Sequence, residues 1–572
     1  MKNYLLLFFS ICILLIAACE KDTDTDVTTD NKSTDTSVHE DSSDYSWDAS
    51  AAVNIKLNIS SISVESPSAI VSGNTVTITS AGIYSISGTL TDGQIIVNTE
   101  DEEKVVLILN GAHITSSKSA PIYISKAKKA IVYITEDTEN SLTDASTYVY
   151  ASSDVDEPNA ALYSKSDLTI FGEGSLAVKG NFNDGITGKD GLIVKSGNIT
   201  VNSLDDGIIG KDYLIIKDGT FVLNCGGDGI KSSNEESTAL GYVTIESGKI
   251  KVVSGGDAIA AQTDVLITSG EFNLTSGGGS SKTVAATLSS KGIKGKTSVF
   301  IEDGTFTINS ADDGIHSNNE ITVNKGVIAI SSSEDGMHAD SKLTINDGDI
   351  TIAKSYEGIE SGLITVVTGK VSITASDDGF NASYGKGGES NDGSSLNLKG
   401  GNIFVNGSGG DGLDSNGNIE ITGGTIVVNG PQSSPEVGMD YNGTCKITDG
   451  FLIISGTNSN MTQAPGTSSS QYSLKAIMTS SIAANTLFHI QDADGNDVVT
   501  FRPVRSYYSM VFSSPALKKG ATYYIYTGGS STGTLTNCIY KDGNYTAGTL
   551  VTSFTVSSVV TSYGNSGSGS RG

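Results

Sequence analysis

The sequence predicts an all-β protein built as a parallel β-helix, a solenoid of stacked coils with three strands each. Glycine is abundant, with 67 of 572 residues, whereas proline accounts for only 8. Glycines recur at a spacing close to 22 residues, and apolar residues alternate at fixed offsets from each of them. Three short strands fit into a period of that length, and such coils stack at about 4.8 Å. A propeller blade needs about 40 residues, so the spacing excludes a propeller.

The repeat is clearest in residues 161–470, the predicted regular β-helix. Its marker glycines are Gly197, Gly219, Gly248, Gly270, Gly304, Gly326, Gly348, Gly369, Gly401, Gly424 and Gly450. The residues five and three positions before each glycine, and two and four after it, are apolar, so two alternating strands meet at a glycine turn. A third short stretch adds one inward apolar residue, such as Ile186. Cys445 occupies one apolar column and is therefore expected to be buried.

The first 19 residues have the pattern of a lipoprotein signal peptide. An apolar run over residues 4–18 follows Lys2, and as a helix it would span about 22 Å, short of the roughly 30 Å hydrocarbon core. Small residues before Cys19 resemble a bacterial lipobox, which predicts cleavage there and lipid attachment to Cys19. A plain secretory signal is the alternative. Residues 20–48 are rich in Asp, Thr and Ser and are expected to form a disordered acidic tether.

These features predict a lipid-anchored protein of the cell envelope, exposed at the surface of the outer membrane. Residues 49–160 are expected to form an N-terminal cap and irregular first coils. Residues 471–560 lose the period and are expected to form a small C-terminal β cap, and residues 561–572 a flexible tail. The formal net charge of −28 disfavours binding to nucleic acid and favours cations as partners.

A row of acidic residues follows the marker glycines at a nearly constant offset. The candidate ligands of Ca²⁺ are Asp184, Asp190, Asp205, Asp206, Asp212 and Asp228, then Asp312, Asp313, Glu334, Asp335 and Asp340, then Glu357, Asp377 and Asp378. Unit charges about 4.8 Å apart repel by about 3.5 kcal/mol at an effective dielectric constant of 20, so the row needs neutralisation. Calcium takes six to eight oxygen ligands and suits such clusters. The alternative is that each Asp-Gly pair only makes a turn, with Asp capping its own backbone.

Several motifs resemble a bacterial family of carbohydrate-binding β-helices. They include Ala120-Pro121-Ile122-Tyr123, Asn183-Asp184-Gly185-Ile186 with Gly188-Lys189-Asp190, and Asp205-Asp206-Gly207-Ile208 with Gly210-Lys211-Asp212. The resemblance extends over roughly residues 50–530. It implies a right-handed parallel β-helix that binds calcium and polysaccharides, both cellulose and acidic sugars such as polygalacturonate, and that is similar in fold to the family 9 pectate lyases.

Three functional hypotheses follow. The preferred one is noncatalytic, calcium-dependent binding of an acidic polysaccharide, because calcium would bridge protein and sugar carboxylates. The second is a calcium-dependent polysaccharide lyase of the pectate type, with Lys189, Lys211 or Lys231 as the base. Lysines beside carboxylates usually form ion pairs that raise their pKa, which disfavours this role. The third is a structural or adhesive surface rod.

Two histidines form a separate candidate site. His316 and His338 are 22 residues apart and are therefore expected to be neighbours in adjacent coils. Such a pair could hold a transition metal or act as a general base. A solvated polar ladder is the simpler interpretation.

Overall fold

The computed structural model describes residues 36–285, 287–385 and 390–564. The signal peptide, Cys19, residues 20–35 of the tether and residues 565–572 of the tail lie outside this part of the chain. The chain divides into a unit of residues 1–40, described only around the short 3₁₀ helix η1 (Thr36–His39), and a unit of residues 41–572. Within the described ranges, no helix has the length and apolar character needed to span a membrane.

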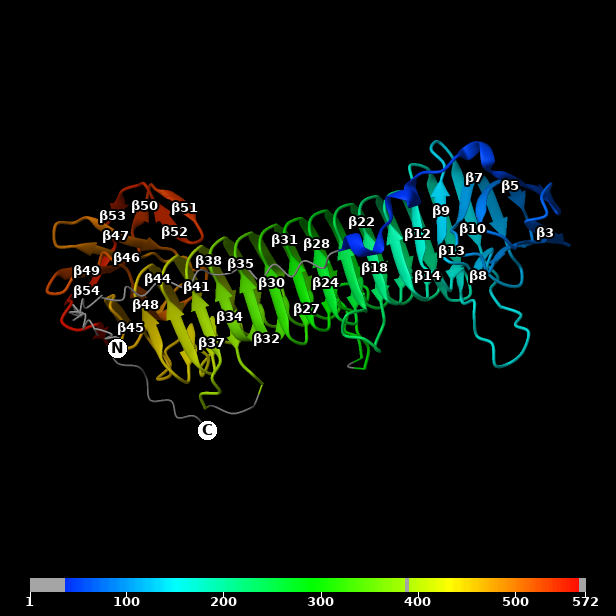
Figure 1. Ribbon diagram of the computed structural model, residues 1–572. Coiled ribbons are helices and arrows are strands. Elements are labelled where there is room, and N and C mark those ends of the chain that lie inside the picture. Colours follow the sequence, from blue (N-terminus) through cyan, green and yellow to red (C-terminus); the bar gives the residue numbers. More distant parts are fainter. Residues whose placement is uncertain (1–35, 286, 386–389, 565–572) are drawn as a thin grey trace, which may run out of the picture. The chain divides into compact units, whose positions relative to one another are not determined.

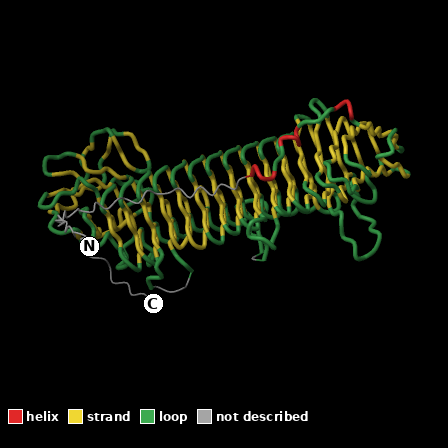
Figure 2. The backbone as a smooth tube through the Cα atoms, viewed as in Figure 1, coloured by secondary structure: helices red, strands yellow, loops and turns green. Residues whose placement is uncertain are grey.

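The second unit is a parallel β-helix, which confirms the predicted fold class. One sheet of 47 strands contains almost all of the repeat, and each strand pairs in parallel with its equivalent in the next coil. Figure 1 shows the coils following one another from β12 to β44, and Figure 2 shows strands recurring regularly with loops leaving between them. The strands of each coil fall on three faces, numbered here in chain order.

Face 1 consists of β9 (Ala130–Ile134), β12 (Leu168–Gly172), β15 (Gly191–Val194), β18 (Tyr213–Ile216), β21 (Tyr242–Ile245), β24 (Asp264–Ile267), β27 (Ser298–Ile301), β30 (Glu320–Val323), β37 (Ser395–Leu398), β40 (Asn418–Ile421) and β43 (Cys445–Ile447). Face 2 consists of β10 (Glu139–Thr143), β13 (Ser175–Gly180), β16 (Asn198–Ser203), β19 (Thr220–Cys225), β22 (Lys249–Ser254), β25 (Glu271–Ser276), β28 (Thr305–Ser310), β31 (Val327–Ser332), β33 (Asp349–Lys354), β35 (Lys370–Ala375), β38 (Asn402–Gly407), β41 (Thr425–Asn429) and β44 (Phe451–Gly456).

Face 3 consists of β4 (Thr75–Ile78), β6 (Gln94–Asn98), β8 (Ile122–Lys126), β11 (Ala160–Ser164), β14 (Asp184–Gly188), β17 (Ile208–Gly210), β20 (Ile230–Ser232), β23 (Ile259–Ala261), β26 (Ile293–Gly295), β29 (Ile315–Ser317), β36 (Phe380–Ala382), β39 (Leu413–Ser415) and β42 (Met439–Tyr441). Four strands run continuously through a corner and serve two faces: β5 (Gly82–Leu90), β7 (Val105–Thr115), β32 (Met337–Ile345) and β34 (Ile359–Val366).

Antiparallel strands end the stack on both sides. At the N-terminal end, β1 (Val53–Ile59) pairs with β2 (Ile62–Val64), and β3 (Ala69–Ser72) pairs with β4. At the C-terminal end, β48 (Tyr507–Ser513) pairs antiparallel with β44 and with β45 (Ser473–Ile482), which in turn pairs with β55 (Val560–Tyr563). A separate antiparallel sheet has the order β51 (Thr534–Thr536), β52 (Ile539–Lys541), β47 (Asp497–Phe501), β46 (Phe488–Asp492), β49 (Thr522–Thr527) and β54 (Thr549–Thr555). The short pair β50 (Ser530–Ser531) and β53 (Tyr545–Thr546) completes the module. Such ends leave fewer edge groups open to edge-to-edge association.

The apolar columns predicted from the repeat form the core. Leu192, Val194, Ile199 and Val201 are all buried, and the same holds at equivalent positions in the other coils. Cys445 is fully buried within this core, as predicted. Because every inward side chain stacks on its equivalent in the next coil, the core is continuous along the β-helix.

Glycines keep two positions of the coil free of side chains. At the turn between faces 1 and 2, Gly304 has a φ of +135°, which side-chain-bearing residues rarely adopt. Just before face 3, a Cβ atom on Gly314 would lie 2.5 Å from the carbonyl oxygen of Gly336 in the next coil. This close approach explains why an acid is so often followed by glycine there.

The packed part of the chain begins before residue 49, where the composition placed the end of the tether. Helices η2 (Ser42–Tyr45) and η3 (Ala49–Ala51) lie in this segment. Asp44 is 3% exposed, and its carboxylate lies 2.5 Å from Lys129 Nζ and 3.4 Å from Lys104 Nζ. Trp47 packs edge-on against Tyr133 and Phe171. The composition did not predict this packing because only a few residues of the acidic segment make the contacts.

Replacing the buried carboxylate should detach this segment. In Asp44→Ala, Lys104 and Lys129 lose this carboxylate, and breaking a buried ion pair costs about 3–5 kcal/mol. Since Trp47 is the only tryptophan of the chain, its fluorescence reports the segment directly. We expect a red-shifted emission with an almost unchanged melting of the β-helix, measured by circular dichroism. An unshifted spectrum would show that Asp44 does not hold the segment.

Candidate functional site

The predicted row of acids is observed at the corner before face 3, where it forms a hydrogen-bonded ladder. In most of these acids, one carboxylate oxygen accepts a hydrogen bond from the backbone N–H at the equivalent position of the next coil. The pairs are Asp184 with Asp206 N (3.2 Å), Asp206 with Asp228 N (2.7 Å), Asp228 with Asp257 N (2.8 Å), Asp313 with Asp335 N (3.1 Å), Asp335 with Glu357 N (3.2 Å), Asp378 with Asp411 N (2.5 Å) and Asp411 with Val437 N (2.5 Å). The acids therefore cap the neighbouring coil, rather than their own backbone as the turn interpretation supposed.

A second column lies three residues after the ladder, at the centre of face 3, and is called here the outer column. In register, it runs Tyr123, Tyr163, Thr187, Ile209, Lys231, Ala260, Lys294, His316, His338, Glu360, Asn381, Asp414 and Asp440. Its character changes along the axis, from aromatic and apolar through basic to acidic. The ladder thus meets a different partner in each part of the β-helix.

In the first predicted cluster, a lysine of the outer column neutralises the ladder. Lys231 Nζ lies 2.9 Å from both Asp206 and Asp228. Burial alone would lower the pKa of Lys231, but the two carboxylates raise it well above its usual value. Asp184, farther along the ladder, has a pKa raised to about 7 by burial and by the charges of Asp206 and Asp205.

Asp190 and Asp212 do not join this first cluster. They follow the strands of face 3, whereas Asp184 is the first residue of β14 and Asp206 precedes β17, so the length of the strand separates the two rows. Asn234 donates a hydrogen bond to Asp212 over 2.6 Å. The pKa of Asp190 is raised by burial and by the neighbouring carboxylates of Asp167 and Asp212.

The second predicted cluster also contains its own cations. Lys291 Nζ lies 2.7 Å from Asp312 and 2.7 Å from Asp313, and His316 Nδ1 lies 2.8 Å from Asp313. Burial would raise the pKa of Asp313, but the hydrogen bonds and charges of His316 and Lys291 together hold it far below its usual value. Glu334 is exposed, and together with Asp312 and Asp313 it lines a cleft of about 760 Å³.

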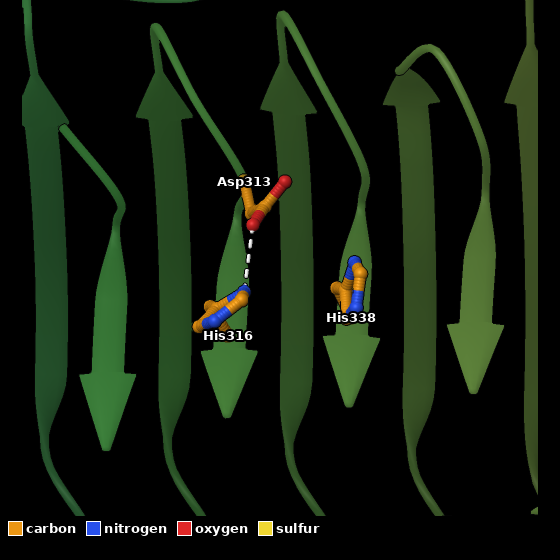
Figure 3. A group of neighbouring side chains, drawn as sticks. All are labelled: Asp313, His316 and His338. Atoms are coloured by element: carbon orange, nitrogen blue, oxygen red, sulfur yellow. Dashed lines mark hydrogen bonds and ion pairs between the residues drawn. The ribbon is translucent and has the colours of Figure 1, made fainter. Parts of the chain in front are cut away.

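His316 and His338 are adjacent in register, as predicted, with ring centroids 5.1 Å apart. Figure 3 shows the two rings on neighbouring strands, with Asp313 above His316. His338 Nδ1 lies 3.0 Å from Asp335 and 3.1 Å from Glu360, and its Nε2 lies 3.3 Å from Asp340. Burial would lower the pKa of His338, but hydrogen bonds to the Asp335 and Glu360 carboxylates raise it to about 11.

The members of the third predicted cluster contact different partners. Asn381 donates a hydrogen bond to Glu357 over 2.9 Å, and the pKa of Glu357 is raised to about 9 by burial and by the charges of Glu360 and Asp335. Asp378, with Asp377 beside it in the chain, instead faces the following coils.

The following coils contain the densest group of carboxylates, called here the acidic pocket. It is a cavity of about 210 Å³ lined by Asp378, Asp411, Asp414, Glu436 and Asp440 among other residues. Carboxylate oxygens of Asp411, Asp414 and Asp440 lie within 4.8 Å of one another. Burial and the charges of Asp378, Asp414 and Asp440 raise the pKa of Asp411 to about 9.

Most of the acidic pocket was missed as a calcium site by sequence reasoning, which selected only Asp378. Asp411, Asp414 and Asp440 were not among the predicted ligands. The feature that could have identified Asp414 and Asp440 is their position in the outer column. There, an acid occupies the position that Lys231 or His316 has in earlier coils. The pKa of Asp378 is itself raised to about 7, by burial and then by the charges of Asp377 and Glu436.

The three lysines considered as catalytic bases all have carboxylate partners. Lys189 lies 2.7 Å from Glu157, Lys211 lies 3.4 Å from Glu236, and Lys231 pairs with two ladder acids. A base must release its proton near the working pH, and an ion pair with a carboxylate opposes this release. The geometry therefore disfavours these lysines as bases.

Two substitutions at Asp184 separate a structural role of the ladder from metal binding. Asp184→Ala leaves the backbone N–H of Asp206 without its acceptor, which costs about 1–3 kcal/mol. Asp184→Asn keeps a side-chain oxygen and removes a buried charge, so we expect a smaller loss. Thermal melting in the presence of EDTA measures both. Equal destabilisation by the two substitutions would contradict the ladder's structural role.

The raised pKa values in the acidic pocket predict a pH dependence of stability. Because the pKa of Asp411 rises to about 9 on folding, the folded state favours the protonated carboxyl. The associated stability is fully present below about pH 4, the unfolded pKa, and is lost as pH rises through the folded value. In EDTA, we expect the Tm to fall from about pH 5 to about pH 9, and Asp411→Asn to reduce that fall. An Asp411→Asn protein whose Tm falls as steeply as that of the wild type would contradict this assignment.

Comparisons with known proteins match parts of the chain. Residues 72–336 match a family model described as "Carbohydrate-binding domain-containing protein". A protein of the same description from Acetivibrio thermocellus is 45% identical over 133 residues, which are 23% of this chain and 46% of that protein. The chain thus spans less than half the length of this relative. A solved structure titled as a polysaccharide lyase-like protein from C. thermocellum, a gadolinium derivative, aligns with a TM-score of 0.38 and 29% identity over 51% of this chain and 96% of the other. Residues 72–336 are therefore similar to carbohydrate-binding domains.

Proposed function

We propose that this protein binds polysaccharide without cleaving it, that binding depends on calcium, and that acidic sugars such as polygalacturonate are its preferred ligands. The match of residues 72–336 to a carbohydrate-binding family is the observation that carries the first part. The formal charge of −28 supports the second part, because an unmetallated surface of this kind repels uronates.

The acidic pocket is the best calcium site for this proposal. Its donors are carboxylate oxygens, the ligands that calcium prefers. Asp411, Asp414 and Asp440 would hold the ion, with Asp378 beside them. In the coils before it, Lys231, Lys291 and the histidines already compensate the ladder. A bound calcium ion supplies positive charge that attracts sugar carboxylates, whereas the protein residues fix its position on face 3.

Neutral glucans such as cellulose are less favoured as ligands. Sugar rings usually stack on exposed aromatic side chains, and Trp47 is engaged with Tyr133 and Phe171. Tyr163, another aromatic candidate, is fully buried, whereas Tyr356 is 49% exposed. The ring of Tyr356 is therefore accessible to a sugar, and Tyr356 is next to the ladder acid Glu357 in the sequence.

Cleavage is the alternative function, and we infer that it does not occur. The ion pairs of Lys189, Lys211 and Lys231 support this inference. The further proposal that the chain is anchored by lipid at Cys19 and displayed at the outer membrane rests on the N-terminal sequence alone.

A binding assay with polygalacturonate tests the proposal. We expect calcium-loaded protein to bind the polymer and EDTA to abolish binding. The double variant Asp411→Asn with Asp414→Asn should lose at least about tenfold in affinity, since two charged ligands are removed. Glu139→Gln, which changes an exposed acid of face 2, is the matched control and should bind as the wild type does.

The same samples test the alternatives. An increase in absorbance near 235 nm (the unsaturated product's band) during incubation would reveal a lyase. Equal binding with calcium and with EDTA would contradict calcium dependence. If the protein bound no glycan, the remaining hypothesis would be a structural or adhesive surface rod.

A further inference from the structure

His338 lies close to charged side chains from three successive coils. Its Nδ1 lies 3.0 Å from Asp335 Oδ2 and 3.1 Å from Glu360 Oε2. His316 lies in the preceding coil, with its own Nδ1 directed to Asp313 (Figure 3). The polysaccharide proposal assigns no role to this group, which is formed by side chains of the outer column and the ladder.

The spacing of these atoms matches that of ligands around one metal ion. Metal–ligand distances near 2.1 Å place neighbouring ligand atoms about 3.0–3.4 Å apart. Ligand atoms of Asp335, His338 and Glu360 all lie within 4.8 Å of one another, and two of the three separations already fall in that range. Small side-chain rotations are enough to bring the third into range.

The surroundings of the group also suit a metal. The side chains of Asp335 and Glu360 are 11% and 23% exposed, so two carboxylates share a largely buried place with one imidazole. Asp313 holds the Nδ1 atom of His316, an arrangement that leaves Nε2 available and that commonly orients histidine ligands. A cleft of about 760 Å³, lined by Asp313, His316, Asp335 and His338 among others, gives access from solvent.

We propose that Asp335, His338 and Glu360 bind a divalent transition-metal ion, such as Zn²⁺, with His316 as an additional nitrogen donor. Imidazole nitrogen favours such ions over calcium, which prefers oxygen alone. The site lies on the outer column before Asn381, whereas Asp414 and Asp440 follow it, so the two metal sites use different residues.

Titration with Co²⁺ in the presence of excess Ca²⁺ tests the proposal, since Co²⁺ reports its ligands through visible absorption. We expect one Co²⁺ per chain, visible bands typical of nitrogen and oxygen ligands, and displacement by Zn²⁺. His338→Ala should weaken binding by at least about tenfold and alter the bands. His113→Ala is the matched control, because His113 contacts Ser141 in an early coil and should leave binding unchanged.

Two further variants distinguish loss of the metal site from destabilisation of the coil and from effects on the calcium site. Glu360→Gln removes a ligand charge without changing size, and it should weaken Co²⁺ binding even if His338→Ala destabilises the coil. Asp411→Asn should leave Co²⁺ binding unchanged, which separates this site from the calcium proposal. Absence of Co²⁺ binding, or the same affinity and spectrum in Glu360→Gln and the wild type, would overturn the proposal.

Discussion

Stacking of equivalent residues at one strand spacing is the constraint on which the rest of the structure depends. In a β-helix, a residue repeated in every coil meets copies of itself about 4.8 Å away on both sides. For apolar residues this repetition builds the core. For acids it creates repulsion that the fold must offset in each coil. The ladder offsets part of this repulsion through hydrogen bonds that the carboxylates accept from backbone N–H groups of the neighbouring coil.

The remaining negative charge is offset differently along the axis. Lys231 serves two ladder acids, and Lys291, His316 and His338 serve the coils that follow. Beyond Asn381 the outer column is acidic, and the pKa values of Asp378 and Asp411 in the ladder there are raised to about 7 and about 9. The difference between these two regions is the physical basis for placing a calcium ion in the acidic pocket and not in the first predicted cluster.

The coil could be predicted well from the sequence because its repeat depends on residue types at fixed offsets within each coil. The marker glycines adopt positive φ angles at a fixed turn, and the apolar columns could be read without any contact being known. The same register correctly made neighbours of His316 and His338 and buried Cys445.

Ion pairing could not be predicted in the same way. Lys291 contacts Asp312 and Asp313, although its distance in the sequence from the preceding ladder acid, Asp257, does not match the period. Asp440 follows another irregular step, so its alignment with Asp414 is visible only in the strand register. Packing of Trp47 was hidden for a related reason, since its partners Tyr133 and Phe171 come from distant coils.

Anomalous diffraction from crystals of the calcium-loaded protein tests the central claim most directly, because it locates the ions without assumptions about function. The account predicts a calcium peak among Asp411, Asp414 and Asp440, and no peak beside Lys231. A peak between Asp206 and Asp228, with Lys231 displaced and the acidic pocket empty, would contradict it.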